Sequence, residues 1–161
     1  MKGNTFFYEV VRWTTVVLAV LSLIGMFGGN TISDAEPENV AAAVTQAIDT
    51  ANMTPGDNQM LKRLYGLDPS AYESCILYYP ATNMMAEELL IVKLADVAQA
   101  ETVRAAAEAR LDTQKNTFEG YGVEQYELLS NHCVLEVRGN YVLFLVHTNA
   151  GDGLDAFLDA L

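Results

Sequence analysis

The stretch His132–His147, HCVLEVRGNYVLFLVH, predicts a β-hairpin and decides the fold. Gly139-Asn140 separates two runs of strand-forming residues. A two-residue Gly-Asn connection is typical of a hairpin turn, because glycine adopts a positive φ without steric cost. This turn places Arg138 opposite Tyr141, and every other cross-strand pair follows from that register.

The register divides the hairpin into two faces of different character. One face is wholly apolar and must be covered by other parts of the chain. Its pairs are Val137 with Val142, Leu135 with Phe144, and Cys133 with Val146. The other face is mixed and tolerates water, with the pairs Arg138–Tyr141, Glu136–Leu143 and Val134–Leu145. We therefore expect helices on the apolar face alone.

The remainder of the chain predicts a second hairpin and several helices. Strands are expected over 73–79 and 88–94, with the Lys93 side of the second strand facing outward. Helices are expected over 37–51, 58–65, 97–118, 123–130 and 154–161. This order predicts an α+β domain of two layers: a four-stranded antiparallel sheet of two hairpins, with helices on one face. The order of the hairpins across the sheet is left open.

The charge of the chain argues against several classes of partner. The formal net charge is −12, and the first thirty residues contribute +1 through Lys2, Arg12 and Glu9, so the remainder carries −13. A domain this acidic repels phosphate backbones and anionic lipid headgroups. We expect no nucleic-acid partner.

The N-terminal region predicts a membrane segment. No charged residue occurs from Trp13 to Ser33, and the run 16–27 is almost purely apolar. Positive charge precedes this run and acidic residues follow it, which predicts a domain outside the cytoplasm. We therefore expect a membrane segment over 1–35, single-pass in the cell membrane, and an extracytoplasmic domain over 36–161. Two alternatives stay open: an uncleaved anchor, or a signal cut at Ser33-Asp-Ala35, which would release a secreted domain.

Few residues suggest chemistry. His132 and His147 are expected opposite one another and are weak candidates for a metal site with a nearby carboxylate, although solvated histidines at a sheet rim are commoner. Cys75 and Cys133 are expected to be inert thiols or, in an exported domain, a disulfide. Glu87-Glu88 suggests acid–base chemistry or, more simply, a solvated acidic face. No nucleophile motif or phosphate-binding loop occurs, so we assign no catalytic residue and no cofactor.

Several motifs resemble a known family. In order they are the segments 64–69 (LYGLDP), 87–93 (EELLIVK), 110–115 (RLDTQK) with Tyr121 and Glu124-Gln125, and 138–142 (RGNYV). Together they resemble a bacterial family of domains of unknown function, number 4358, over about residues 37 to 160. The resemblance implies a short extracytoplasmic protein held by an N-terminal membrane segment. Many relatives carry a lipid-attachment cysteine there, which this chain lacks. The family has no assigned activity.

These observations favour a non-enzymatic binding or accessory domain of the cell envelope. Tyrosine is abundant, and it is enriched at binding surfaces because it combines large area with a polar tip. The expected binding residues lie on the mixed sheet face: Arg138, Tyr141, Glu136 and Leu143. Its partner would be an envelope protein or a glycan. The alternatives are an envelope hydrolase, or a small structural subunit of a membrane complex.

Overall fold

A computed structural model describes residues 31–161, and Ile32–Leu161 form one compact unit. Residues 1–30 of the expected membrane segment lie outside the part of the chain that the structure describes. Within the described part of the chain, no helix is long and apolar enough to cross a membrane. The helices are α2 (Pro37–Ala47), α3 (Asn58–Tyr65), α4 (Ala100–Phe118), α5 (Val123–Asn131) and α6 (Ala150–Asp159). The strands are β1 (Met53–Pro55), β2 (Ser74–Pro80), β3 (Glu88–Lys93), β4 (Cys133–Arg138) and β5 (Tyr141–Val146).

The five strands form one antiparallel sheet in the order β1-β2-β3-β5-β4. The predicted hairpin register is confirmed: Arg138 pairs with Tyr141 across a turn in which Gly139 has a φ of 54°. The two hairpins join through β3 and β5, which the sequence left open. These two central strands are buried along their whole length.

The expectation of four strands was wrong because it missed β1. Residues 54–57, Thr-Pro-Gly-Asp, read as a helix breaker, yet Thr54 pairs with Tyr79 at the edge of the sheet. Pro55 ends this strand, a position that proline tolerates because it needs no ladder N–H there. Gly56 then approaches Leu77 so closely that a Cβ would lie 2.6 Å from its side chain.

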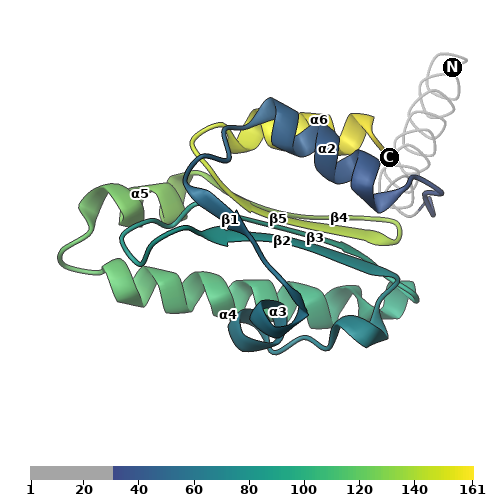
Figure 1. Cartoon of the computed structure of the whole chain (residues 1–161), viewed down its shortest axis with the longest axis horizontal. Coiled ribbons are helices and arrows are strands. Elements are labelled where there is room, and N and C mark those ends of the chain that lie inside the picture. Colours follow the sequence, from purple (N-terminus) through teal and green to yellow (C-terminus); the bar gives the residue numbers. More distant parts are fainter. Residues whose placement is uncertain (1–30) are drawn as a thin grey trace, which may run out of the picture. The chain divides into compact units, whose positions relative to one another are not determined.

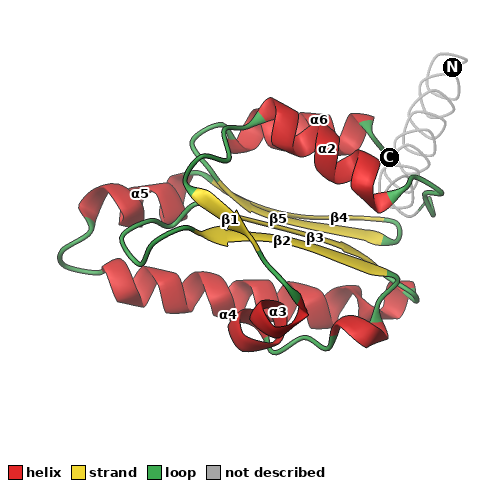
Figure 2. Cartoon of the chain, in the orientation of Figure 1, coloured by secondary structure: helices red, strands yellow, loops and turns green. Residues whose placement is uncertain are grey.

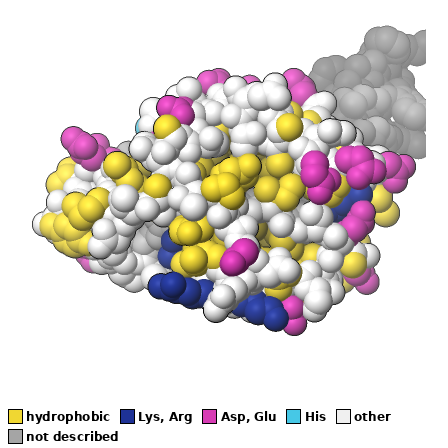
Figure 3. All heavy atoms as spheres, viewed as in Figure 1, with side chains coloured by type: hydrophobic (Ala, Val, Ile, Leu, Met, Phe, Trp, Pro, Cys, Tyr) yellow, Lys and Arg dark blue, Asp and Glu magenta, His cyan; other side chains and the backbone are white. Residues whose placement is uncertain are grey.

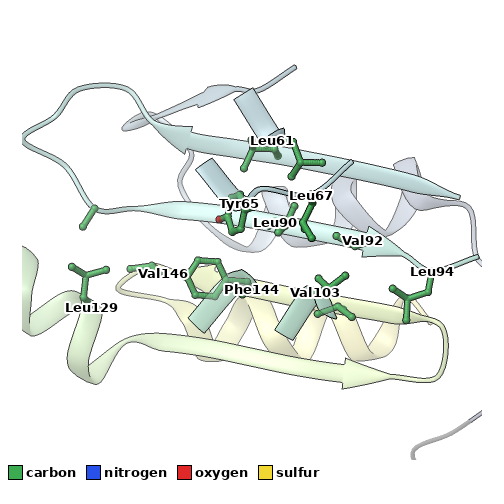
Figure 4. Packing of buried hydrophobic residues seen from close by; sticks show 14 of the residues in the cluster. Leu61, Tyr65, Leu67, Leu90, Val92, Leu94, Val103, Leu129, Phe144 and Val146 are labelled. Carbon is green, nitrogen blue, oxygen red and sulfur yellow. The ribbon is translucent and has the colours of Figure 1, made fainter. Parts of the chain in front are cut away.

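Helices cover both faces of the sheet, not one (Figures 1 and 2). The face with Leu135 and Phe144 packs on α3 and α4, as expected, and Tyr65 meets Phe144 edge to face at 6.2 Å between ring centroids (Figure 4). The mixed face packs on α2 and α6 in a second core that includes Leu143 and Phe157. The fold is therefore α+β in three layers.

The helix α6 begins four residues earlier than predicted. Gly151 and Gly153 suggested a loop, but both lie inside the helix. A Cβ on Gly153 would lie 2.4 Å from the side chain of Leu145, so glycine lets this helix approach the sheet closely. The same contact helps to close the second core. A residue that weakens an isolated helix thus serves the packing of this one.

Residues 33–35 are hydrogen-bonded into the domain. The side chain of Asn140 accepts from the N–H of Ser33 at 2.8 Å and donates to its carbonyl at 3.1 Å. The Ser33 hydroxyl donates to the carbonyl of Leu161 at 2.8 Å. Tyr141 Oη and Lys93 Nζ both donate to the carbonyl of Ala35, at 2.6 and 3.2 Å. The segment in which a cleavage site was expected is therefore part of the folded unit.

Removing these contacts is expected to destabilise the domain. Asn140→Ala leaves the buried N–H and C=O of Ser33 without partners, which costs about 1–3 kcal/mol in free energy of unfolding. A fragment that begins at Glu36 is expected to unfold at lower urea concentration than one that begins at Ile32. Asn116→Ala, on the exposed face of α4, is the matched control for Asn140→Ala. Equal urea midpoints for the two fragments would contradict a structural role for residues 33–35.

Candidate functional site

The four expected binding residues do not form an open surface. Tyr141 and Leu143 are completely buried under α2 and α6, so the expectation that this face meets solvent was wrong. The ring of Tyr141 packs edge to face on Phe157, with 6.3 Å between the ring centroids. Lys93, whose side of β3 was expected to face outward, is also buried; its Nζ lies 2.7 Å from the Glu73 carboxylate, whose hydrogen bond raises the pKa of Lys93.

Arg138 and Glu136 lie on the edge strand β4 and are only half-buried. Their side chains form an ion pair with 2.8 Å between nitrogen and oxygen. The two opposite charges therefore balance one another on this edge strand. A binding role for these two residues stays a prediction.

The two histidines have separate local partners. The N–H of His147 donates to the carbonyl of His132 at 3.1 Å, so the two residues are neighbours across the hairpin as expected. The exposed ring of His132 places Nδ1 3.1 Å from the Thr148 carbonyl. In the buried ring of His147, Nδ1 accepts from the N–H of Asn149 at 2.9 Å, while Nε2 lies 3.9 Å from Glu87. Across residues 31–161, no three histidine, cysteine or acidic side chains gather in a way that would hold a metal ion.

The two cysteines are free thiols on strands that are not neighbours. β2 and β4 are separated by β3 and β5, which places them roughly 14 Å apart at the usual strand spacing. A disulfide needs Cα atoms within about 7 Å, so the two residues cannot form a disulfide within one chain. Burial raises the pKa of Cys75 and of Cys133 to about 11.

A buried polar cluster lies between the sheet and α4, and its centre is Glu88 (the Glu88 cluster: Tyr65, Glu88, Arg110 and Gln114). Glu88 is completely buried, so the interpretation of Glu87-Glu88 as a solvated face fails for this residue. Its carboxylate accepts from Arg110 Nε at 3.1 Å and Nη2 at 2.9 Å, from Tyr65 Oη at 2.6 Å, and from Gln114 Nε2. Burial, followed by the charge of Glu88, raises the pKa of Tyr65, which keeps the phenol protonated as the donor.

Sequence reasoning missed this cluster although a signal was present. Glu88 opens an apolar strand and faces the same side as Leu90 and Val92. Arg110 and Gln114 are four residues apart, so they share one face of α4. An acidic residue facing a core and a basic residue on a core-facing helix indicate a buried pair, but only the packing of β3 on α4 shows that they meet.

An apolar surface lies at the α4–α5 turn (the α5 patch: Met84, Tyr121, Val123 and Tyr126). These four residues are 63, 64, 67 and 39% exposed, and they are four of the six large hydrophobic residues exposed in the described chain. Two open hollows of about 440 and 370 Å³ lie here, both floored by Phe118. Figure 3 shows hydrophobic side chains gathered over α5 at the left end of the molecule.

The α5 patch is held in shape and rimmed by acidic residues. Gln125 Oε1 accepts from the N–H of Ala86 at 2.9 Å, which ties α5 to the loop that carries Met84. Gly120 has a φ of 87°, and a Cβ on Gly122 would lie 2.4 Å from Phe118, so both glycines are required by the turn. Glu119, Glu124 and Glu127 line the same hollows. The surface is thus apolar in its centre and negative at its rim.

Breaking the Glu88 cluster is expected to cost more than breaking an exposed ion pair. Arg110→Ala leaves a buried carboxylate without its cation, and we expect a loss of about 3–5 kcal/mol in free energy of unfolding, measured by urea denaturation. Arg104→Ala on the same helix removes a partly exposed pair with Glu101 and is expected to cost about 0–1 kcal/mol. Similar losses for both variants would refute the buried pair.

The thiols are expected to react slowly in the folded protein. A pKa of about 11 leaves roughly one thiol in a thousand ionised at pH 8, and only the thiolate attacks a disulfide reagent. A colorimetric thiol assay without reductant should therefore show slow reaction until urea is added, and then two thiols per chain. Fewer than two thiols after unfolding would indicate a disulfide.

The family match covers all five strands and the helices α3, α4 and α5. The family described as "Domain of unknown function (DUF4358)" matches residues 46–147, from the end of α2 to the residue after β5. The match includes all of the Glu88 cluster and the α5 patch. No curated protein and no solved structure matches the chain. Because the match spans 102 of 161 residues, which is more than half, the chain belongs to the DUF4358 family of domains of unknown function.

Proposed function

We propose that this protein is a membrane-anchored, extracytoplasmic binding domain of the cell envelope that acts without catalysis. It docks a partner protein through the α5 patch. The observation that carries the proposal is the clustering of four exposed residues: Tyr121, Val123 and Tyr126 at the α4–α5 turn and the start of α5, and Met84 on the neighbouring loop between β2 and β3. Exposed apolar clusters with a polar rim are typical of protein interaction sites, and tyrosine is enriched in them.

The acidic rim indicates the chemistry of the partner. Glu119, Glu124 and Glu127 surround the apolar centre, so the complementary surface combines apolar side chains with lysine or arginine. A helical segment with an apolar face and basic flanks has this chemistry. The partner is therefore a protein that presents such a segment.

Residues 33–35 support the anchored alternative over the cleaved one. Ser33 and Ala35 are hydrogen-bonded to Asn140, Tyr141 and Lys93, as is expected of residues that the mature domain retains. Cleavage after Ala35 would separate Ser33 and Ala35 from the domain and leave Asn140, Tyr141 and Lys93 without these hydrogen-bond partners. The sign of the flanking charges supports an extracytoplasmic position for the domain.

The hydrolase alternative gains nothing from the cysteines. Both thiols have raised pKa values and lie half-buried in the sheet, which makes them poor nucleophiles. A small structural subunit and a docking domain differ in which part of the protein contacts the partner. A structural subunit would associate through its N-terminal segment, whereas the docking domain binds through the α5 patch.

Site-directed photocrosslinking tests the docking surface. A photoreactive residue at Tyr126 of the full-length protein is expected to form a discrete adduct in the membranes of expressing cells. The same residue at Val97, a half-exposed hydrophobic position away from the patch, serves as the control and should give none. Val123→Asp should weaken partner binding by about 1 kcal/mol or more and so lower the yield of the adduct, because it places a charge in the centre of the interface. High salt should weaken the adduct as well, because it screens the acidic rim.

Two results would oppose the proposal. Equal adducts from Tyr126 and Val97 would show that the patch is not the interface. Loss of the adduct when a cleavable secretion signal replaces the N-terminal segment ahead of Ile32 would favour a structural subunit, because the domain is still exported but lacks its anchor. The intact mass of the membrane-bound protein tests the anchor separately, and a full-length mass is expected.

A further inference from the structure

A third hollow, of about 300 Å³, lies between α3, the end of β2 and α4 (the Gln114 pocket). Its apolar walls come from Met60, Leu64, Met85 and Phe118, and its polar lining includes Arg63, Arg110 and Gln114. The volume is at the lower end of the range for small-molecule sites. Arg110 and Gln114 also belong to the Glu88 cluster, so a buried network fixes one wall of the pocket.

The network leaves one buried acceptor without a donor. Gln114 is only 5% exposed, and its Nε2 donates to the Glu88 carboxylate. This contact determines which way the amide points, because a carboxylate between Arg110 and Tyr65 only accepts hydrogen bonds. Within the described residues, Oε1 of Gln114 finds no hydrogen-bond donor. A buried acceptor is costly unless a donor reaches it, so a ligand that brings an N–H or O–H group to Gln114 would remove that cost.

The charge of the pocket is opposite to that of the domain. The described residues carry a net charge of −13, yet the lining contains two arginines and no acidic residue. The charge of Arg110 is balanced by Glu88, whereas Arg63 is exposed and makes no ion pair with any described residue. Figure 3 shows Lys and Arg side chains gathered along the lower edge, over α3 and α4. The mouth of the pocket therefore attracts an anion.

We propose that the Gln114 pocket binds an N-acyl α-amino carboxylate with an apolar side chain. The carboxylate binds Arg63, the amide N–H next to it donates to Oε1 of Gln114, and the side chain packs on Met60, Leu64 and Met85. Methionine adapts to irregular shapes, which suits a wall that accepts several apolar side chains. The same chemistry occurs in free acylated amino acids and at the carboxyl end of a peptide. This site is independent of the docking role of the α5 patch.

An NMR titration of the full-length protein in neutral detergent tests the site. N-acetyl-leucine is expected to shift the Gln114 side-chain amide saturably. N-acetyl-leucinamide lacks the carboxylate and 4-methylpentanoate lacks the N–H, so each should bind about tenfold more weakly or worse. A short peptide that ends in leucine separates the two sources: tighter binding than N-acetyl-leucine indicates a peptide end, and equal binding a free acylated amino acid.

Paired charge variants provide the control. Arg63→Gln should lower the affinity for N-acetyl-leucine about tenfold. Lys62→Gln removes the same charge from the neighbouring residue of α3, which does not line the pocket, and should leave the affinity within about twofold. Four results would each overturn the proposal: no saturable shift, equal binding of N-acetyl-leucinamide, equal binding of 4-methylpentanoate, or an unchanged affinity in Arg63→Gln. Lys62 and Arg63 are both exposed, so we expect both variants to fold.

Discussion

The pairing of β3 with β5 is the constraint on which the rest of the structure depends. All twelve residues of these two central strands are buried, although each strand presents side chains to both faces of the sheet. A central pair of this kind requires cover on two sides, because apolar area left in water costs about 25 cal/mol per Å². The helices α3 and α4 supply one cover, and α2 and α6 supply the other. The three layers follow from this pairing.

Glu88 places a charge inside one of these layers and shapes a surface site by doing so. A buried ion pair adds little to stability compared with apolar side chains of the same volume. Its effect here is orientation: the carboxylate receives four donors, and the donors from α4 are thereby fixed. Gln114 is left with a buried, unpaired oxygen, and the same residue lines a pocket that also contains Arg63. The core network and the proposed ligand site therefore share Arg110 and Gln114, which lie on one face of α4.

The proposed attachment and docking regions lie at opposite ends of β4. Residues 33–35 contact Asn140 in the turn after this strand, whereas α5 ends just before its first residue. A strand of six residues spans roughly 20 Å. A partner on the α5 patch is therefore held away from the point at which the chain enters the domain. This separation suits a domain that is tethered at one end and binds at the other.

The sequence by itself determined the local features. The Gly139-Asn140 turn sets the register of the last hairpin, because a two-residue turn permits only one pairing. The bounds of α3 were also predictable, since Asp57 caps its first turn and Gly66 ends it with a φ of 68°. The family resemblance was likewise confirmed.

Tertiary structure decided whatever depends on which elements meet. Whether Tyr141 and Leu143 face water is a property of α2 and α6, not of the hairpin, and a mixed face looks solvated until its polar ends find partners such as the Ala35 carbonyl. β1 is too short to show a pattern of its own and exists because β2 offers it an edge. The Glu88 cluster unites residues from three separate segments. Side-chain periodicity reports one element at a time, and long-range pairing is set by packing that no single element contains.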